Sequence, residues 1–530
     1  MSTSCSVTEF PALSTVRLSP NEHAWVRRAT IAPVTLLLVL CGLLVLLRLH
    51  TYDEPLERDI TTYAVIGHEL LGGKALYTDL WDHKPPAIYV TYAAAELLSG
   101  YGRDSIFLIN IAAGIATLLG CYFAGSAGTG GRAGGIFAAV AWLVVSGDLG
   151  LQANQPNTEL FLNAFLTAAF AIIVRRQNVP IRSRIAFLVG SLFAIASLYK
   201  QVVVADAALL TVVYVACTQT GKRSAAVKNV GIIAGVGLSV WGLIWLYFFL
   251  QGRASAFIGA VFTYNSYYSG NIWQNLTHSF FPQRASPDLL TALIPSASIL
   301  VVAGILGLIF GPRRQWIYLL AWALGTHLAV LLPGRFFPHY YQLWLPVLAV
   351  ATGWGATLLA RVLPSRLSGF GYVMGFAICV VMVMIEAPYY TIPASAWSVK
   401  KYGTIFNASE QLASNLDRLL LPKETFYEWG SESGMYFTTK CQPPSGVLFA
   451  EHMLGGPFAI ALSQRLIRDL EQNKPEVIIA NRGTLAYTPA SHPVIVWFAE
   501  NYRPFSKTKD FLLLARRGGR LEQGMRRSVQ

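Results

Sequence analysis

Residues 59–86 read DITTYAVIGHELLGGKALYTDLWDHKPP. This stretch is too polar to insert into a bilayer, and it lies between two apolar runs, 29–47 and 105–124. A helix needs about 20 apolar residues to cross the hydrocarbon core, and both runs reach this length. Loops this long in compact proteins are usually functional, so we expect the stretch to do more than join two membrane spans.

The rest of the chain predicts many more spans. Of its 530 residues, 54% are hydrophobic and 13% are charged, whereas about a quarter of the residues in soluble proteins are charged. The predicted fold class is therefore a polytopic α-helical membrane protein of about 11 spans, and a soluble enzyme is excluded. The expected spans are 29–47, 105–124, 133–147, 160–174, 185–198, 202–217, 230–250, 289–310, 316–332, 342–360 and 370–385.

The basic residues of the loops predict the orientation of these spans. If the N-terminal segment is cytoplasmic, most Lys and Arg of the loops fall on the inner side, and acidic residues crowd into the first outer loop. Cytoplasmic loops retain Lys and Arg, so we expect a multi-pass protein of the cell (inner) membrane with a cytoplasmic N-terminus. The net charge of +13 is then a topology signal, and no nucleic acid is expected as a partner.

Composition divides the chain into four segments. After residue 385 polar residues return and no further run is long enough to span, which predicts a small C-terminal α/β domain. An odd number of spans precedes this domain, so it is expected to be extracytoplasmic. The segments are a cytoplasmic N-terminal segment (1–28), a transmembrane domain (29–387) whose first loop is 51–104, the C-terminal domain (388–515) and a frayed basic tail (516–530). In the C-terminal domain, strands are expected at 425–429, 446–450 and 476–480, and helices near 410–420 and 457–470.

Two helices are predicted within the first loop. The apolar residues after Asp59 recur at helical spacing until the glycines 72–73. A second helix is expected to begin at the prolines 85–86, because proline suits the first turn of a helix. Asp59 then starts one helix and Lys84 precedes the next, both at the outer lipid boundary. A carboxylate and an ammonium group at that depth suit an amphiphilic substrate.

One spaced set of residues in the first loop carries a family resemblance. The set comprises Asp59, Tyr63, the glycine pair, Tyr77 and the run Asp82-His83-Lys84-Pro85-Pro86. It resembles the first-loop signature of membrane glycosyltransferases of the GT-C fold, in particular the protein O-mannosyltransferase and aminoarabinose-transferase branch, which uses polyprenyl-phosphate sugars. The resemblance covers most of 29–390 and includes the later pieces Asn157-Thr158-Glu159, Lys200-Gln201 and Arg335-Phe336-Phe337-Pro338-His339-Tyr340-Tyr341.

The resemblance implies an inverting glycosyltransferase. The donor is expected to be a hexosyl or pentosyl polyprenyl phosphate, and the acceptor a hydroxyl group of an extracytoplasmic glycan, lipid or protein. Such a reaction needs a base for the hydroxyl proton and a cation beside the leaving lipid phosphate. We assign Asp59 as the base and Lys84 as the cation. The other expected site residues are Glu159, Asp53 and Glu54 as further catalytic acids, Lys200, Arg335, His339 and Tyr341 as phosphate ligands, and Tyr63, Tyr77, Asp82 and His83 in the substrate pocket.

Each assignment has an ordinary structural alternative. Asp59 could only cap the helix that follows it, and Glu159 could be an acid that faces a helix dipole. Lys84 and Lys200 could be interfacial anchors that extend to the lipid headgroups. The relatives often carry an adjacent Asp-Glu pair at the catalytic acid, whereas here the pair 53–54 lies six residues before Asp59, so the identity of the base stays open. No metal ligands are assigned, and a divalent cation is left open as a cofactor.

Two other classes of function compete with the glycosyltransferase. A secondary transporter or flippase for an amphiphilic substrate would also have many spans, but transporters place their site near the membrane midplane. A scaffold whose C-terminal domain binds a partner would leave the first loop unexplained. The polar residues of this chain gather in the long outer loops, which favours the enzyme.

Overall fold

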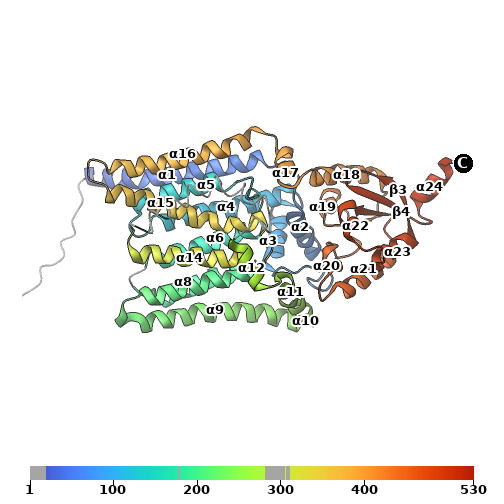
Figure 1. Ribbon diagram of the computed structural model, residues 1–530, viewed down its shortest axis with the longest axis horizontal. Coiled ribbons are helices and arrows are strands. Elements are labelled where there is room, and N and C mark those ends of the chain that lie inside the picture. The colour runs from blue at the N-terminus through green and yellow to red at the C-terminus, as the bar shows by residue number, and fades with distance from the viewer. Residues whose placement is uncertain (1–19, 177–178, 281–304, 306–308, 310, 530) are drawn as a thin grey trace, which may run out of the picture.

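A bundle of roughly parallel helices forms one part of the molecule and a mixed α/β domain forms the other, with the helices of the first loop between them (Figure 1). The computed structural model describes residues 20–176, 179–280, 305, 309 and 311–529. The long helices are α1 (Pro20–His50), α4 (Arg103–Gly125), α5 (Gly131–Val145), α6 (Thr158–Val174), α7 (Ser183–Ser197), α8 (Val204–Cys217), α9 (Arg223–Leu250), α14 (Arg313–Leu331), α15 (Trp344–Val362) and α16 (Gly369–Glu386). Shorter elements are α2 (Arg58–Leu71), α3 (Ala87–Ser99), η1 (Gln201–Val203), η2 (Thr220–Lys222), α10 (Ala254–Ile258), η3 (Gly259–Tyr264), α11 (Asn265–Ser269), α12 (Ile272–Phe280) and η5 (Pro338–Leu343).

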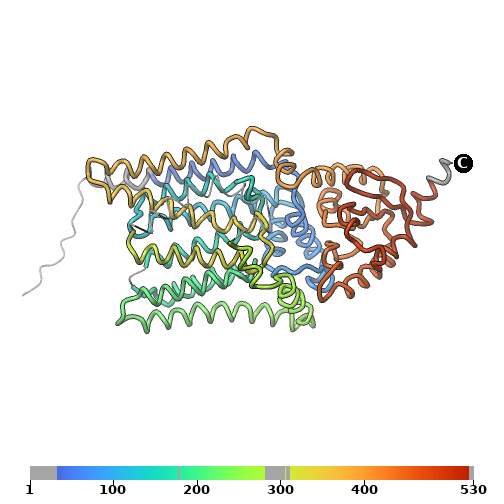
Figure 2. Tube along the Cα trace, viewed as in Figure 1, coloured from blue at the N-terminus to red at the C-terminus, as the bar shows by residue number. Residues whose placement is uncertain are grey.

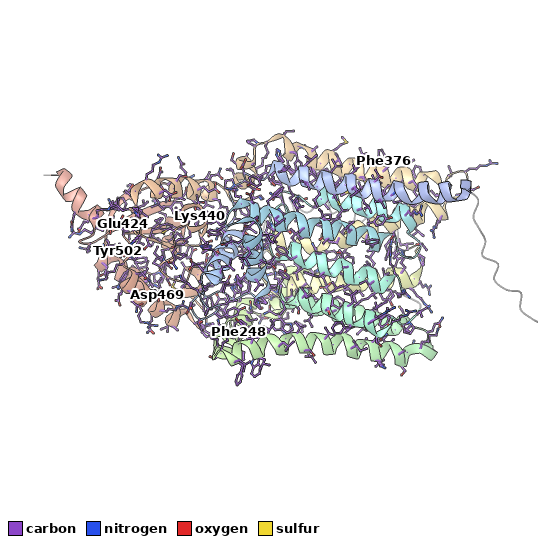
Figure 3. All side chains as sticks on the ribbon, turned by 180° about the vertical axis from the view of Figure 1, so that it is seen from behind. Phe248, Phe376, Glu424, Lys440, Asp469 and Tyr502 are labelled. Carbon is purple, nitrogen blue, oxygen red and sulfur yellow. The ribbon has the colours of Figure 1, made fainter. Side chains whose placement is uncertain are left out.

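The expected spans coincide with helices of the bundle wherever the structure describes them. The span expected at 289–310 falls almost wholly outside the described residues. Apolar side chains such as Phe376, which is 66% exposed, lie on the outer surface of the bundle, as contact with lipid requires (Figure 3). The chain is therefore an integral membrane protein. Among the described residues, five stretches are long and apolar enough to cross a membrane: Pro33–His50, Arg103–Gly125, Thr220–Leu250, Pro338–Val362 and Gly369–Thr391.

Several other helices of the bundle are shorter than a full span. Helix α5 has 15 residues and so rises about 22 Å, less than the roughly 30 Å of a hydrocarbon core. An irregular polar segment, 146–157, follows it before α6 begins. The Asn157 side chain starts α6 by accepting a hydrogen bond from the Thr158 backbone N–H at 2.8 Å. This early end of α5 leaves room for polar residues at one end of the bundle.

Both helices predicted in the first loop are confirmed. Helix α2 begins where the Glu57 side chain accepts a hydrogen bond from the Asp59 backbone N–H, and α3 follows the two prolines. The two helices approach closely at Gly67, where a Cβ atom would lie 2.9 Å from the Ala93 backbone nitrogen. They form a packed pair of helices that carries Asp59 at its start and Lys84 just before its second helix.

The C-terminal domain is built on a four-stranded sheet in the order β1-β2-β4-β3. Strands β1 and β2 are parallel and the other neighbours are antiparallel. Every residue of β2 is buried, as suits an apolar strand with neighbours on both sides. The helices expected near 410–420 and 457–470 correspond to α18 and α21. The elements are η6 (Ala387–Thr391), α17 (Ala394–Tyr402), α18 (Ile405–Leu419), β1 (Phe426–Trp429), α19 (Gly434–Thr439), α20 (Glu451–Leu454), α21 (Ala459–Asn473), β2 (Val477–Asn481), α22 (Arg482–Tyr487), α23 (Pro493–Asn501), β3 (Tyr502–Lys507), β4 (Phe511–Arg516) and α24 (Arg520–Val529).

The C-terminal domain packs onto the first loop, although the two are far apart in the sequence. Figure 2 shows the blue trace of the first loop beside the red trace of this domain. The hydroxyl oxygens of Thr61 and Thr62 on α2 lie 2.9 and 2.6 Å from the Ser433 hydroxyl oxygen. Arg58 and Glu432 form an ion pair at 3.8 Å. The start of α2 is thereby enclosed between the bundle and the C-terminal domain.

The prediction of one of the three strands expected in the C-terminal domain is wrong. The stretches 425–429 and 476–480 are confirmed as β1 and β2. The stretch 446–450 is not a strand, because its backbone pairs locally with the first loop. The Gly446 carbonyl accepts a hydrogen bond from the Trp81 N–H at 3.0 Å, and an isolated bridge follows at the next residue.

The prediction that residues 516–530 form a frayed tail is also wrong. Arg516 ends β4 and pairs with Glu476 at 3.0 Å. Arg520 begins α24 and pairs with Glu424 at 2.7 Å. Two strands, β3 and β4, precede this helix and were not predicted. Arg516 and Arg520 have acidic partners far upstream, which the local sequence does not indicate.

Glu428 in β1 makes the stability of this domain depend on pH. The residue is 1% exposed, and burial together with the neighbouring Glu432 raises the pKa of Glu428 well above its ordinary value of 4.5. The folded protein keeps a proton that the unfolded chain releases, so the free energy of unfolding should fall as the pH rises above 4.5. Glu428→Gln cannot ionise and should flatten this fall, measured from denaturant midpoints at about pH 5 and pH 8. A variant midpoint that falls as steeply as that of wild type would contradict the expectation.

Candidate active site

Asp59 and Lys84 face each other where the first loop meets the bundle. The Lys84 Nζ atom lies 3.1 Å from Asp59 Oδ2. Two hydrogen bonds hold the chain at Lys84: the Tyr77 hydroxyl donates to the Lys84 carbonyl at 2.8 Å, and the Asn265 amide donates to the His83 carbonyl at 2.7 Å. The residues assigned from the sequence as base and cation are thus neighbours in space.

This pair carries opposite charges at neutral pH. Burial by itself would raise the pKa of Asp59, but the Lys84 ammonium outweighs it, and the pKa of Asp59 lies below its ordinary value of 3.8. Burial also opposes the charge on Lys84, yet the carboxylates of Asp59 and Asp82 raise the pKa of Lys84 above its ordinary value. The Tyr63 hydroxyl lies 3.3 Å from Asp59 Oδ2, and the Tyr63 ring centroid lies 5.0 Å from Lys84 Nζ. An ionised Asp59 can accept a proton, and a charged Lys84 can bind an anion.

A second ion pair joins two further predicted residues. Glu159, in the first turn of α6, is fully buried, and its Oε1 atom lies 2.7 Å from Lys200 Nζ. The same Nζ atom lies 3.3 Å from the ring centroid of Tyr340. Burial lowers the pKa of Lys200, whereas the Glu159 carboxylate and the aromatic face of Tyr340 both favour its charged form.

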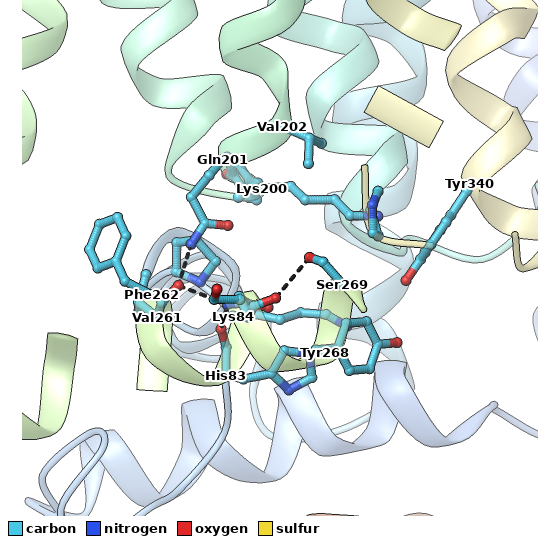
Figure 4. Close-up of a pocket in the computed structure, with 15 residues that line it drawn as sticks. His83, Lys84, Lys200, Gln201, Val202, Val261, Phe262, Tyr268, Ser269 and Tyr340 are labelled. Carbon is cyan, nitrogen blue, oxygen red and sulfur yellow. Dashed lines mark hydrogen bonds between the residues drawn. The ribbon is translucent and has the colours of Figure 1, made fainter. Parts of the chain in front are cut away.

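The two lysines line one cavity of about 290 Å³. Figure 4 shows Lys84 and Lys200 extending across this cavity from different elements, towards Tyr268 and Tyr340. Much of the remaining wall is apolar and includes Val202. Concave sites that are mostly apolar with a few placed polar groups are typical ligand pockets. Two cations beside an apolar wall suit an anionic head group attached to an apolar chain.

A π-helical turn, η3, forms part of the cavity wall. Such turns are uncommon and often occur at functional sites. The Val261 carbonyl in this turn accepts hydrogen bonds from Gln201 Nε2 and from Asn265 Nδ2, both at 2.8 Å. Sequence reasoning missed Asn265, because it belongs to no recognised motif. The only signal was a short run of aromatic and polar residues, 262–269, after an apolar span.

The remaining predicted phosphate ligands have different surroundings. The Arg335 guanidinium carbon lies 4.2 Å from the ring centroid of Tyr268, which lines the cavity. The His339 Nδ1 atom lies 3.3 Å from Gln152 Oε1. Tyr341 packs against the hydrophobic core of the bundle and does not line the cavity. None of these three side chains lines the cavity, but Arg335 and His339 pack against two tyrosines that do, Tyr268 and Tyr340.

The two earlier acids of the first loop are not beside Lys84. Asp53 is exposed. The carboxylate of Glu54 is fully buried and lies 2.6 Å from Lys401 Nζ, whose side chain is also fully buried. Asn154 joins this pair, because its Oδ1 atom accepts a hydrogen bond from Lys401 at 2.8 Å and its amide donates to Glu54. Glu54 thus ties the first loop to α17, the helix that leads into the C-terminal domain.

We expect Lys401→Met to destabilise the protein strongly. Removing one partner of a buried ion pair leaves an uncompensated charge, which lowers the free energy of unfolding by about 3–5 kcal/mol. Lys400, exposed in the same turn of α17, offers the matched control Lys400→Met. Denaturant unfolding in detergent should separate the two variants. Equal stability of both variants would contradict a structural role for the Glu54–Lys401 pair.

Three side chains beside Lys84 could hold a metal ion. Ligand atoms of Asp82, His83 and His452 all lie within 4.8 Å of one another. The Nδ1 atoms of both histidines are buried without a hydrogen-bond partner, although His83 Nδ1 lies 3.1 Å from Asp82 Oδ1. Burial lowers the pKa of His452 to about 3, so its ring is neutral, as a metal ligand must be. Sequence reasoning missed His452, because no spacing connects the C-terminal domain with residues 82–83.

Comparison with known proteins identifies the fold. The sequence matches no family model and no curated protein. ArnT from Cupriavidus metallidurans, solved with undecaprenyl phosphate, is 15% identical with a TM-score of 0.57 over 93% of this chain and 98% of its own. AglB from Archaeoglobus fulgidus, an archaeal oligosaccharyltransferase solved with an inhibitory peptide and a dolichol-phosphate, is 12% identical with a TM-score of 0.52 over 93% and 74%. The chain has the GT-C fold.

A further structure of the Archaeoglobus fulgidus oligosaccharyltransferase, in complex with Zn and sulfate, is 13% identical with a TM-score of 0.54 over 91% of this chain and 73% of its own. The GT-C fold expected from the first-loop residues is confirmed by these likenesses. Identities this low identify a fold and transfer no residue roles. The roles of residues in this GT-C chain must come from its own geometry.

Proposed function

We propose that this GT-C protein transfers a hexosyl or pentosyl unit from a polyprenyl phosphate to a hydroxyl group, with inversion at the anomeric carbon. The observation that carries the proposal is the cavity in which Lys84 and Lys200 meet an apolar wall beside Asp59. The lipid phosphates present in the ArnT and AglB structures support this donor class. The acceptor is a glycan, a lipid or a protein.

In the proposed reaction one bond forms as another breaks. The acceptor hydroxyl gives its proton to the Asp59 carboxylate, and its oxygen attacks the anomeric carbon. The bond between that carbon and the phosphate oxygen breaks, and the lipid phosphate leaves with the bonding electrons. Lys84 stabilises the negative charge that develops on this phosphate, which lowers the barrier because the charge is greater in the transition state than in the ground state. A single displacement of this kind inverts the configuration.

The second ion pair supports the same step. Lys200 reaches the phosphate from another element, and Glu159 orients its ammonium group. Arg335 and His339 are proposed as further phosphate ligands, because they lie beside the aromatic residues of the cavity wall. Asp59 remains the proposed base, since it alone among the predicted first-loop acids pairs with Lys84 within the described residues.

No observation favours a transporter or a flippase. The elements that form the cavity, including η3 and the turn before α3, lie at the end of the bundle beside the C-terminal domain (Figure 1). Transporters commonly bind their substrate near the bilayer midplane. In the proposed orientation the N-terminus is cytoplasmic, and the C-terminal domain is extracytoplasmic at the inner membrane.

Turnover of lipid-linked sugars tests the proposal. The purified protein is incubated with a panel of polyprenyl-phosphate sugars and, separately, with nucleotide sugars. We expect release of polyprenyl phosphate from one or more of the lipid-linked sugars and no reaction with the nucleotide sugars. A deletion strain should accumulate the lipid-linked donor. Absence of turnover across the panel, with no accumulated lipid in the strain, would contradict the proposal.

We also propose a divalent cation at Asp82, His83 and His452. Two imidazole nitrogens and a carboxylate suit zinc, and a cation there would fix the C-terminal domain against the turn that precedes Lys84. The purified protein is expected to carry about one zinc per chain, measured by elemental analysis. His452→Ala should lose this metal, whereas His492→Ala, which alters a partly buried histidine of the same domain, should retain it. Equal metal content in both variants would contradict this site.

A further inference from the structure

The two acids that pair with the cavity lysines, Asp59 and Glu159, each stand at the start of a helix, and the two helix starts are hydrogen-bonded to each other. The Glu57 Oε2 atom accepts a hydrogen bond from the Asp59 N–H at 3.1 Å, at the start of α2. The Asn157 Oδ1 atom accepts one from the Thr158 N–H at 2.8 Å, at the start of α6, one residue before Glu159. The Asn157 Nδ2 atom donates to Glu57 Oε1 at 3.2 Å. Glu57 caps α2 and Asn157 caps α6, and the two capping side chains are hydrogen-bonded to each other.

A tyrosine closes this arrangement into a ring. The Tyr63 hydroxyl lies 3.3 Å from Asn157 Oδ1 and 3.3 Å from Asp59 Oδ2. The backbone N–H of Glu57 donates to Gln155 Oε1 at 3.2 Å, which ties the same residue to the segment before α6. The contacts therefore run from Asp59 through Glu57 and Asn157 to Tyr63 and back to Asp59.

Capping alone does not explain a glutamate at position 57. Ser, Thr, Asp and Asn are the preferred caps, because their short side chains reach the first turn. Glu57 is 7% exposed and Asn157 is 3% exposed, and Glu57 forms no ion pair within the described residues. A buried carboxylate without a cation partner is destabilising unless its hydrogen bonds are made. The longer side chain of Glu57 reaches both the Asp59 N–H and the Asn157 amide.

We infer that Glu57 and Asn157 are positioning residues, whose mutual hydrogen bond sets the separation of Asp59 from Glu159 and thereby of Lys84 from Lys200. This inference rests on the proposed function and adds two residues to it. Both side chains are buried, and within the described residues neither is bonded to Lys84 or Lys200, so we assign neither a direct contact with the substrate. Their effect is exerted through the two ion pairs at the cavity wall.

An exchange of the amide and the carboxylate tests this inference. Glu57→Gln leaves an amide donor facing another donor, either the Asp59 N–H or the Asn157 amide. Asn157→Asp places two carboxylates against each other. The double variant, Glu57→Gln with Asn157→Asp, restores one donor and one acceptor, because the new amide can donate to the new carboxylate. It also retains one carboxyl group in the pair.

We expect each single variant to lower kcat by about 10- to 100-fold, as small misplacements of catalytic groups do. The KM for the polyprenyl-phosphate sugar should change little, and the double variant should recover most of the lost kcat. Rates are expressed per folded molecule, and unfolding midpoints are recorded beside them. Asn481→Asp is the matched control, because Asn481 caps α22 and donates to the buried Glu432 at 3.0 Å in the same manner. It should leave kcat unchanged.

The outcomes separate this inference from the proposed function. No turnover by the wild-type protein would remove the proposed function and this inference with it. Wild-type turnover with unchanged kcat per folded molecule in both single variants would overturn this inference alone, since a purely structural pair moves only the unfolding midpoint. A double variant no better than the product of the single effects would overturn it as well, because it would show no coupling between the two residues.

Discussion

Asp59→Asn should lower the rate of sugar transfer by about 10²- to 10⁴-fold, the usual contribution of a general base. An asparagine keeps the shape of the side chain and cannot accept the proton of the acceptor hydroxyl. The Lys84 ammonium holds the pKa of Asp59 below 3.8, so the wild-type carboxylate is ionised at neutral pH and ready for this role. Transfer of labelled sugar from a polyprenyl phosphate by the purified variant measures the loss.

The control for this variant lies in the same loop. Asp53→Asn removes an exposed carboxylate, and it should leave most of the activity. Both proteins should elute as folded monodisperse species with similar unfolding midpoints. If Asp59→Asn retained full activity while Asp53→Asn lost it, the base would be Asp53 and the assignment to Asp59 would be wrong.

Lys84→Met should lower kcat by about 10²- to 10³-fold, as the loss of one group that stabilises a developing oxyanion does. The methionine preserves most of the volume and removes the charge that faces the leaving phosphate. Lys74→Met, in the same loop and partly exposed in a pair with Glu69, is the matched control and should retain activity. A loss confined to KM would contradict the role in the transition state and would favour simple binding.

Removal of the Lys84 charge should also change the pH dependence of the transfer activity. Lys84 lowers the pKa of Asp59, so its removal should raise that pKa. As the solution is made acidic, Lys84→Met should therefore lose its residual activity at a higher pH than the pH at which wild type loses its activity. An acid limb at the same pH in both proteins would indicate that Asp59 is not the group that titrates.

The first loop was predictable because its signals are local. Asp59 and Lys84 each stand next to a helix start that the sequence marks, one by helical spacing up to a glycine pair and one by two prolines. The chain between them is short enough for the two ends to meet, and the structure brings them to 3.1 Å. Sequence patterns specify elements of this size well.

Contacts between distant segments were not predictable. Lys200 and Glu159 were each selected from the sequence, but only the packing of the bundle makes them a pair. His452 reaches His83 from a separate domain, and no periodicity connects the two. Glu54 looked like a candidate acid, whereas its buried partner, Lys401, lies far downstream.

The errors in the C-terminal domain have a similar cause. The apolar stretch 446–450 resembles a strand, yet its backbone pairs with Trp81 of the first loop. Strand β3 is mostly exposed and contains a proline, so it lacks the apolar alternation of a buried strand. Strand β4 precedes a basic, glycine-containing stretch, and its place beside β2 depends on pairing that no local pattern encodes.

A structure of the protein with a polyprenyl-phosphate sugar bound tests the central claim most directly. The account predicts that the phosphate lies within about 3 Å of Lys84 Nζ, between this lysine and Lys200, with the anomeric carbon on the side of Asp59. A phosphate bound elsewhere on the bundle, with this cavity free of donor, would contradict it.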